Sequence, residues 1–421
     1  MRFETPLSYR AYRTLTGLIP LIARRHLRKR IAKGKEHDSR WIEKLGQATL
    51  PRPAGRLIWL HAVGLGEVLA LRGLIDALHA RDADLNFLVT SGTLASSKVF
   101  EKNAPANTVH QFLPLDHPRY IRAFLDHWQP DLSIWSEQEI WPNHVFEIHK
   151  QGIPLALING RLTSDAFESR SRFKRLYQSV YQRFSYVVAQ DLQTADRLAK
   201  LGALDVKTHP TLKAGCAPLA ADAGDLQTLQ ESTQGRMIWA ATSTHPADET
   251  MALEAHKRLL DVQPDALLIV APRNPSEMDT LRAGAAKNGM TLAFRGETHL
   301  PSVHTQVFVS DTFGELGLWY RLARRALIGG SFGDIGGHNP WEAAQLDCAI
   351  LHGPNMANFI PDMKALHAEN AALETSDTDG LFAALIDDAT LDMPPRARVV
   401  ADRMGRTVYD LADELTGMLK S

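Results

Sequence analysis

The stretch WLHAVGLGE at residues 59–67 has the pattern of a strand that turns directly into a helix. Residues 57–63 form a short apolar run, and Gly64 and Gly66 permit a tight backbone turn. Residues 67–80 then repeat apolar side chains at helical spacing. Because a buried strand followed by a helix is the repeating unit of parallel α/β sheets, this stretch predicts a doubly wound α/β domain whose first strand begins at residue 57.

The same alternation continues outward from this stretch over most of the chain. Further strands are expected at residues 86–90, 131–135, 154–158 and 186–190, and after a break at 237–241, 266–271, 306–310, 326–330 and 348–351. A long helix is expected from Pro394 to Leu419. A length of 421 residues also favours two hydrophobic cores. We therefore predict two Rossmann-like, doubly wound parallel-sheet domains that face a cleft.

The break in the pattern sets the expected domain limits. Residues 209–235 contain Ala, Gly and Pro without strong periodicity, and they are predicted to form the linker. The first sheet domain is then 51–208 and the second is 236–421, preceded by a separate segment at 1–50. The two cysteines, Cys216 and Cys348, have neither a disulfide framework nor metal-ligand spacing, so we expect buried thiols in a reducing compartment.

Charge is distributed unevenly, although the formal net charge is only −1 and gives no indication of nucleic-acid binding. Residues 1–35 contain ten Lys and Arg but only one acid, Glu4, and apolar and aromatic residues lie between them. The charge-free run Thr14–Ala23 is shorter than the roughly 20 residues that span a bilayer. The segment is predicted to be basic and amphipathic and to lie on an anionic membrane surface. A solvated basic arm, or a helix packed on the body of the protein, is the alternative.

Polar residues at the carboxyl ends of the strands are the candidates for ligand binding, because ligands of such sheets bind there. Glu67, in the first helical turn after 57–63, is a candidate general base for a glycosyl transfer that inverts the configuration at the anomeric carbon. Glu137 and Glu139 follow the strand 131–135 and can bind hydroxyls, and Arg161 follows 154–158 and can hold a phosphate or carboxylate. The structural alternatives are helix N-terminal acids and a surface cation.

The second half carries a glycine-rich stretch, GGSFGDIGGHNPWE at residues 329–342, between a strand and a helix. Its glycines allow the backbone to approach a phosphate, and Glu342 can accept hydrogen bonds from ribose hydroxyls. The stretch matches neither a phosphate-binding Walker loop nor the dinucleotide fingerprint, and a purely structural turn is the alternative. Arg273, after the strand 266–271, would place a guanidinium at the same edge. The stretch DTFGEL at 311–316 would add backbone amides at a helix start, where anions can bind.

No metal or other cofactor is expected from the sequence. The two Asp-x-Asp strings, at residues 82–84 and 377–379, have the lettering of metal-dependent transferases. Both precede strands, at the end of the sheet opposite the predicted site.

Seven strings, taken together and in order, resemble the Kdo (3-deoxy-D-manno-octulosonic acid) transferase family of lipopolysaccharide synthesis. They are HAVGLGE at 61–67, EQEIWPN at 137–143, NGRL at 159–162, STH at 243–245, PRNP at 272–275, DTFGEL at 311–316 and GGHNPWE at 336–342. The resemblance implies the GT-B fold, with an N-terminal acceptor domain and a C-terminal domain that binds the CMP-sugar. It also implies an inverting transfer of Kdo from CMP-Kdo to a phosphorylated, acylated glucosamine disaccharide, the lipid A precursor lipid IVA, at the cytoplasmic face of the inner membrane of a Gram-negative cell.

The resemblance also implies roles for individual residues. Glu67 would be the proton acceptor, and Glu137 and Lys213 would stabilise the transition state. Glu139 and Arg161 are acceptor-side candidates. The residues expected to contact CMP are Pro272, Arg273, Phe313, Gly314, Glu315, Asn339, Pro340, Trp341 and Glu342.

Two other functions remain open at this stage. A UDP-sugar transferase or a sugar-nucleotide epimerase would have the same two-domain cleft. A non-catalytic protein of the membrane surface would have no need to retain Glu67, Arg273, Asn339 and Glu342 together.

Overall fold

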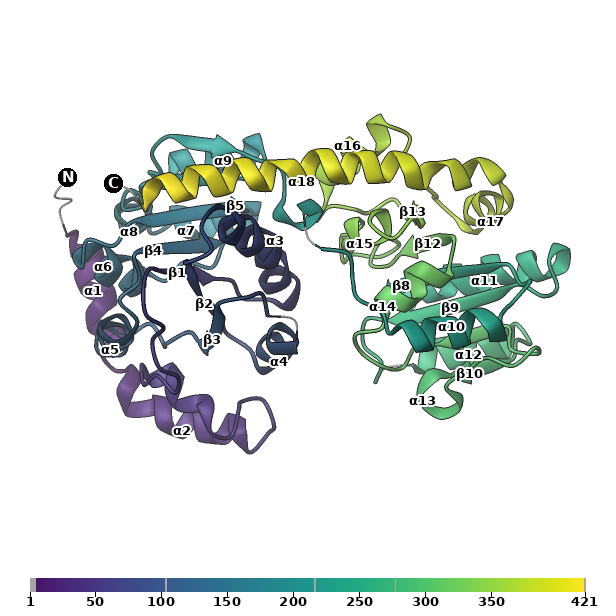
Figure 1. Ribbon diagram of the computed structural model, residues 1–421, viewed down its shortest axis with the longest axis horizontal. Helices are drawn as coiled ribbons and strands as arrows, with labels where there is room; N and C mark the ends of the chain where they lie inside the picture. Colours follow the sequence, from purple (N-terminus) through teal and green to yellow (C-terminus); the bar gives the residue numbers. More distant parts are fainter. Residues whose placement is uncertain (1–4, 103, 216, 277, 420–421) are drawn as a thin grey trace. The chain divides into compact units, whose positions relative to one another are not determined.

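The computed structural model describes residues 5–102, 104–215, 217–276 and 278–419, which form two compact units (Figure 1). Unit 1 comprises Met1–Cys216 together with Met404–Ser421, and unit 2 comprises Ala217–Arg403. Arg2 and Glu4 of the basic segment, and the thiol of Cys216, lie outside the described residues. Cys348 is fully buried, as expected, and burial raises the pKa of its thiol.

Unit 1 contains a parallel sheet of seven strands in the order β3-β2-β1-β4-β5-β6-β7, counted over the described residues. Its strands are Leu57–His61 (β1), Asn86–Ser91 (β2), Thr108–Phe112 (β3), Leu132–Ser136 (β4), Leu155–Gly160 (β5), Tyr186–Ala189 (β6) and Val206–Thr208 (β7). The chain reverses its direction of winding between β1 and β4, which are neighbours in the sheet. This switch point is where doubly wound sheets bind their ligands.

Helices cover both faces of this sheet. They are Leu7–Thr16 (α1), Ile19–Ile31 (α2), Leu65–Arg81 (α3), Leu94–Lys102 (α4), Pro118–Trp128 (α5), Pro142–Lys150 (α6), Ser164–Ser171 (α7), Lys174–Tyr181 (α8) and Leu192–Lys200 (α9), with short 3-10 helices at Arg40–Leu45 (η1) and Leu212–Gly215 (η2). Successive side chains of β1 point to opposite faces. Trp59 therefore packs into one core with Phe124 of α5, and Leu60 into the other with Leu71 of α3.

Unit 2 repeats the plan, with seven parallel strands among its described residues in the order β10-β11-β9-β8-β12-β13-β14. Its strands are Ile238–Thr244 (β8), Leu267–Pro272 (β9), Leu292–Phe294 (β10), Val307–Val309 (β11), Arg325–Ile328 (β12), Ala349–His352 (β13) and Ala372–Glu374 (β14). Its helices are Ala223–Ser232 (α10), Pro246–Val262 (α11), Asp279–Lys287 (α12), Arg295–Thr298 (α13), Leu316–Leu322 (α14), Trp341–Ala344 (α15), Ile360–Ala368 (α16) and Thr378–Ile386 (α17), with Asp388–Asp392 (η3) as a 3-10 turn. The winding reverses between β8 and β12. The predicted α/β class of two parallel-sheet domains is confirmed.

The limits of the two units differ from the expected domains at the N-terminal segment, which belongs to unit 1, at the linker and at the last helix. The predicted linker 209–235 is partly helical, because it contains η2 and α10, and the division falls at residue 216 instead. The last helix, Met393–Met418 (α18), begins in unit 2 but ends in unit 1. Its apolar residues Val408, Leu411 and Leu415 complete the core on the α3 face of the first sheet, so the chain's last turns belong to unit 1.

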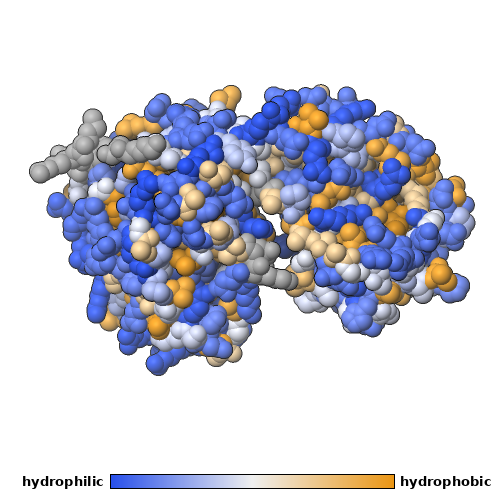
Figure 2. All heavy atoms as spheres, in the orientation of Figure 1, coloured by the Kyte–Doolittle hydropathy of each residue, from blue (hydrophilic) through white to orange (hydrophobic). Residues whose placement is uncertain are grey.

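The basic N-terminal segment forms the helices α1 and α2 of unit 1. Tyr9 is buried and stacks on Phe146 of α6 with ring centroids 3.5 Å apart, and the hydroxyl of Tyr12 donates to Asp116 at 2.7 Å. The segment is thus packed on the body of unit 1 on one side. Its other side exposes large apolar side chains, and Figure 2 shows orange and blue spheres side by side at the lower left, where Figure 1 places α2. Among the described residues, no helix combines the length and the hydropathy needed to cross a membrane.

A buried histidine makes the stability of unit 2 sensitive to acid. His256 of α11 accepts a hydrogen bond from the indole of Trp239 at its Nδ1 (3.1 Å) and donates from Nε2 to the carbonyl of Gln306 (2.9 Å), so it is neutral. Burial lowers the pKa of His256 from 6.5 to about 4. The unfolded chain therefore binds a proton between pH 6.5 and 4 that the folded chain does not.

The contribution of His256 to the free energy of unfolding is fully present above pH 6.5. It falls by about 3 kcal/mol in total as the pH drops toward 4. Denaturant unfolding of the wild-type chain across this range should show the loss. The slope of the free energy of unfolding against pH should be shallower in His256→Gln than in the wild type. It should be unchanged in His304→Gln, where an exposed histidine is replaced. Equal slopes in the wild type and His256→Gln would contradict the assignment.

Candidate functional site

The predicted proton acceptor, Glu67, lies beside the switch point of unit 1. It is in the first turn of α3, directly after β1, and is partly exposed. Its Oε2 accepts hydrogen bonds from the backbone N–H groups of Val63 and Gly64, both at 3.1 Å. This capping interaction fixes the carboxylate at the carboxyl end of the strand.

Glu137 follows β4, the strand next to β1, in an unusual backbone conformation. Its φ of 66° is in the left-handed region, which a residue with a side chain seldom adopts. Its side chain is buried and lies 3.4 Å (Oε1 to Nζ) from Lys213 of η2. The amide of Asn159, at the end of β5, donates to the same oxygen at 3.4 Å. Such strain is kept only where the surroundings hold it, and it is common at functional sites.

The charges of these residues act on one another. Burial raises the pKa of Glu137, and the negative charge of Glu67 acts in the same direction, while Lys213 and Arg161 act against it. Burial and the charge of Glu67 also raise the pKa of Glu139. The structure therefore brings together the predicted residues Glu67, Glu137, Glu139 and Arg161 of the first domain and Lys213, which the sequence analysis assigned to the linker.

Asn159 is a residue of this edge that was not predicted as a site residue from the sequence. It also has a positive φ, of 50°, and is buried. Its Oδ1 accepts from the backbone N–H of Leu212 (3.2 Å), while its Nδ2 donates to Glu137. Asn159 thus links the turn after β4 to η2, which carries Lys213. Asparagine is among the residues that tolerate this backbone region best, and Asn159 directly follows the predicted strand 154–158 and begins the string NGRL, so its position could have indicated it.

In unit 2 the glycine-rich stretch also lies at a switch point, after β12 and next to β8. Its start is held by Asp248 of α11, which is fully buried. One carboxylate oxygen of Asp248 accepts from the N–H of Gly330 (2.7 Å), and the other from Ser331 (3.1 Å) and Phe332 (3.0 Å). These three amides are thus bound to a side chain. The first part of the turn is a structural element, and the sequence did not reveal the acid that holds it.

Replacing Asp248 by asparagine should loosen this turn. One oxygen would be lost, and an NH₂ group would face backbone donors that it cannot satisfy. We expect a loss of about 2–4 kcal/mol in the free energy of unfolding, because buried donors would be left without partners. Denaturant unfolding measures the loss, and hydrogen exchange at residues 330–332 locates it. Asp261→Asn, at an exposed position of the same helix, is the control and should change neither measurement.

Two histidines and an arginine lie at the same edge of unit 2. The rings of His245, after β8, and His338, in the glycine-rich stretch, are stacked at 5.2 Å with their Nε2 atoms 3.0 Å apart. Burial lowers the pKa of His338 to about 4, and the positive charges of His245 and Arg273 act in the same direction. Arg273 itself is exposed directly after β9. The group can bind an anion through the guanidinium of Arg273 and an imidazole N–H group.

The remaining predicted CMP contacts differ in how available their side chains are. Pro272 ends β9, Phe313 is 76% exposed, and Gly314 has a φ of 89°. Glu315 is bound by Arg295 at 3.0 Å. Asn339 donates from Nδ2 to Glu342 at 3.2 Å.

Next to them, Pro340 is buried, and so is the indole of Trp341, which donates to Asp362 at 2.7 Å. A ligand at this edge would therefore meet Trp341 through its backbone. Asn339 and Glu342 are partly exposed, and both carry groups that bind hydroxyls.

The two Asp-x-Asp strings have structural roles in the fold, and the expectation that both precede strands is wrong for 377–379, which follows β14 and begins α17. Asp82 forms an ion pair with Arg56. Asp377 caps α17 by accepting from the N–H of Gly380 at 2.8 Å, and Asp379 forms an ion pair with Arg258.

The two edges offer different chemistry. In unit 1 a fixed carboxylate can take a proton from a hydroxyl, beside a buried acid that is paired with a cation. In unit 2 a guanidinium, imidazoles and polar side chains can hold a phosphate and hydroxyls. Both sets fit a reaction in which a hydroxyl attacks a phosphorylated sugar.

Comparison with known proteins agrees with this chemistry. A family model described as 3-deoxy-D-manno-octulosonic-acid transferase (kdotransferase) matches residues 39–215. The chain is 34% identical to a probable mitochondrial 3-deoxy-D-manno-octulosonic acid transferase of Arabidopsis thaliana, over 86% of this chain and 83% of the relative. It is 30% identical to the 3-deoxy-D-manno-octulosonic acid transferase of Haemophilus influenzae, over 89% of this chain and 87% of the relative.

A solved structure with a similar fold is that of Anabaena HepE in complex with UDP and glucose. It is 12% identical, with a TM-score of 0.57, and the match covers 86% of this chain and all of that one. The likeness spans both units and supports the GT-B fold.

Proposed function

We propose, since this chain belongs to the Kdo transferase family, that it is an inverting glycosyltransferase that moves Kdo from CMP-Kdo to the lipid A precursor lipid IVA. The observation that carries the proposal is the convergence of Glu67 with the buried Glu137–Lys213 pair at the switch point of unit 1. A metal-independent transfer needs a base and a source of positive charge, and this edge contains both.

In the proposed reaction Glu67 takes the proton of the acceptor hydroxyl while that oxygen attacks the anomeric carbon of Kdo. The bond from this carbon to the phosphate oxygen breaks, and CMP leaves with the electron pair. Lys213 and Glu137 stabilise the charge that develops on the reacting groups. Glu139 and Arg161 would bind the acceptor, whose hydroxyls and phosphates match a carboxylate and a guanidinium.

The donor would bind at the edge of unit 2. Arg273 and the neighbouring histidines face the phosphate in this proposal, and Asn339 and Glu342 face the ribose hydroxyls. Pro272, Phe313, Gly314, Glu315, Pro340 and the backbone of Trp341 would complete the nucleotide site. The 76% exposure of Phe313 supports this assignment, because an exposed ring can stack on a base.

The decisive experiment incubates the purified chain with CMP-Kdo and a tetraacylated lipid A precursor and reads the product masses. A mass increase by one or more Kdo residues supports the proposal, and the absence of turnover would support the non-catalytic alternative. CMP at 100 times its Kd should stabilise the chain by about 2.7 kcal/mol, with UDP as the control. Protection by UDP instead would favour a UDP-sugar transferase or an epimerase, since HepE binds UDP with a similar fold.

The lipid acceptor would reach the enzyme at the cytoplasmic face of the inner membrane. Leu18, Leu21 and Ile22, at the start of α2, are 58%, 79% and 66% exposed, and the exposed cations Arg24 and Arg25 follow. Apolar side chains next to cations favour binding to an anionic bilayer surface, where each cation contributes about 1 kcal/mol.

The variant Leu18→Ser/Leu21→Ser/Ile22→Ser should float with anionic vesicles about tenfold less than the wild type, because its apolar contact with the acyl chains is lost. The three side chains are already in solvent, so the fold should be unaffected. Leu192→Ser is the control, since this leucine of α9 is 80% exposed but lies away from the basic segment. Unchanged flotation of the triple variant would remove α2 from the membrane contact.

A further inference from the structure

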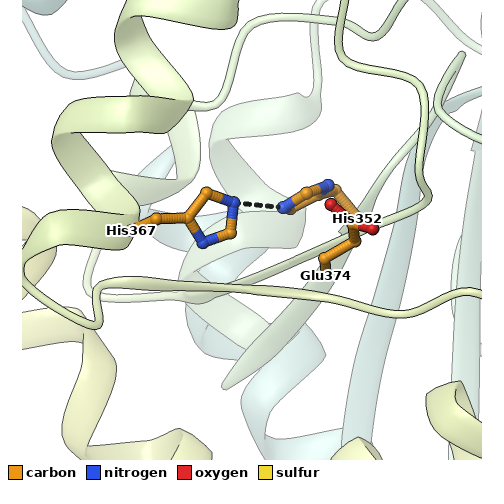
Figure 3. Close-up of side chains that lie close together, drawn as sticks. All are labelled: His352, His367 and Glu374. Carbon is orange, nitrogen blue, oxygen red and sulfur yellow. Dashed lines mark hydrogen bonds between the residues drawn. The ribbon is translucent and has the colours of Figure 1, made fainter.

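Three potential metal ligands of unit 2 lie in one continuous β13–α16–β14 segment, outside the proposed transferase site (Figure 3). His352 and Glu374 end neighbouring parallel strands and are partners in the register. Their side chains therefore leave the sheet on the same face. His367 comes from the last turn of α16, the helix that connects the two strands. One ligand atom from each of the three lies within 4.8 Å of the others.

The hydrogen bonds of His352 determine which of its nitrogens can bind a ligand. Its Nδ1 lies 2.7 Å from the backbone carbonyl of Gly353, and a carbonyl only accepts, so Nδ1 carries the proton. The lone pair is then on Nε2, which faces the Nε2 of His367 at 3.1 Å. A histidine that binds a metal usually donates its other ring N–H to a carbonyl in this way. His352 is 2% exposed, whereas His367 and Glu374 are open to solvent, from which an ion can enter.

We propose that His352, His367 and Glu374 bind a divalent transition-metal ion of the zinc type, with water at the remaining positions. With Zn–N bonds of about 2.05 Å, the 3.1 Å between the two nitrogens corresponds to an N–Zn–N angle of about 100°, near the tetrahedral value. Glu374 is exposed and can rotate toward the ion. Two imidazoles and one carboxylate suit zinc, cobalt or nickel better than magnesium or calcium, which prefer oxygen ligands throughout.

The ion would reinforce the part of unit 2 that supports the glycine-rich turn. Gly353, next to His352, donates its N–H to the hydroxyl of Ser331 at 2.8 Å. The amide of Asn355 donates to the carbonyl of Gly333 at 2.7 Å. An ion that fixes the end of β13 would therefore also fix the loop that contains Gly353 and Asn355, and through their hydrogen bonds the glycine-rich stretch. The proposal revises the expectation of no metal. The sequence did not indicate the site because the spacings of its ligands, 15 residues from His352 to His367 and 7 from His367 to Glu374, match no short metal motif.

The test uses the full chain without a histidine tag, stripped by a chelator and then titrated with Zn²⁺ against a chromophoric competitor. We expect one tightly bound ion per chain and a rise in Tm on binding. His367→Ala should raise the Kd for Zn²⁺ about tenfold or more and abolish the rise in Tm, and Glu374→Gln should weaken binding less. His304→Ala, at another exposed histidine of unit 2, should bind like the wild type. Co²⁺ in place of Zn²⁺ should give an absorption spectrum that His367→Ala lacks.

Two results would overturn the proposal. One is the absence of stoichiometric binding in the wild type, and the other is equal affinity in the wild type and His367→Ala. If His367→Ala lowers the Tm of the chelated protein, and Zn²⁺ changes the Tm of neither form, the contact is a histidine–histidine hydrogen bond that holds α16 on β13. Because no step of the transfer reaction uses this site, the outcome is independent of the CMP-Kdo assay.

Discussion

Glu67→Gln should lower kcat about 10²- to 10⁴-fold, the usual contribution of a positioned general base. Glutamine has nearly the same shape, and its Oε1 can still accept from the backbone N–H groups of Val63 and Gly64. The start of α3 is therefore expected to keep its structure. Only the ability to take up a proton is lost, so the affinity for CMP and the Tm should not change.

Initial rates of Kdo transfer, at saturating donor and acceptor, measure this effect. Glu168→Gln is the matched control, because it makes the same chemical change at an exposed helix position of unit 1 and should leave kcat unaltered. A kcat for Glu67→Gln close to that of the wild type would end the assignment of Glu67 as the base. A large loss of CMP affinity together with kcat would instead indicate a structural role.

The strands show where the sequence was sufficient and where it was not. In both sheets every inner strand was predicted from continuous apolar runs such as those of β1 and β9. The four strands that were missed are β3, β7, β10 and β14, the two edges of each sheet. An edge strand is short and partly solvated, as β7 is, so it lacks a run of buried side chains that a sequence pattern could reveal.

The site residues also divide into those that a local sequence pattern indicates and those that only the folded chain brings together. Glu67, Glu137 and Arg161 could be expected at one edge because each comes after the carboxyl end of a strand, and parallel strands all end at the same edge. Asp248 could not, because it is 82 residues before the first glycine amide that it holds, and only the folded chain brings the two together.

The donor-side strings show a second limit. The sequence did not indicate which side chains of these proposed donor-binding segments face solvent. Trp341 and Glu315 were predicted as nucleotide contacts, yet both side chains are bound within unit 2, by Asp362 and Arg295. Burial depends on neighbours that are distant in sequence, and no local pattern records it.

Lys213→Met should be the most destabilising of the single substitutions considered for unit 1. It removes the cation 3.4 Å from Glu137, whose carboxylate is buried and already acted on by the charge of Glu67. Breaking a buried pair on one side costs about 3 kcal/mol or more, because the remaining charge has lost its partner. The pKa of Glu137 should rise further above its usual value. The variant should therefore lose stability relative to the wild type as the pH rises through that raised pKa.

The double variant Lys213→Met/Glu137→Gln separates stability from catalysis. With the carboxylate gone there is no unpaired buried charge, so most of the free energy of unfolding should return, along with a normal dependence on pH. A double-mutant cycle of denaturant unfolding gives the coupling energy between the two residues. Kdo transfer should stay low in the double variant if the pair stabilises the transition state. Recovery of both stability and kcat would show that the pair only supports the fold, and the cation of the reaction would then have to be sought elsewhere, with Arg161 as the first candidate.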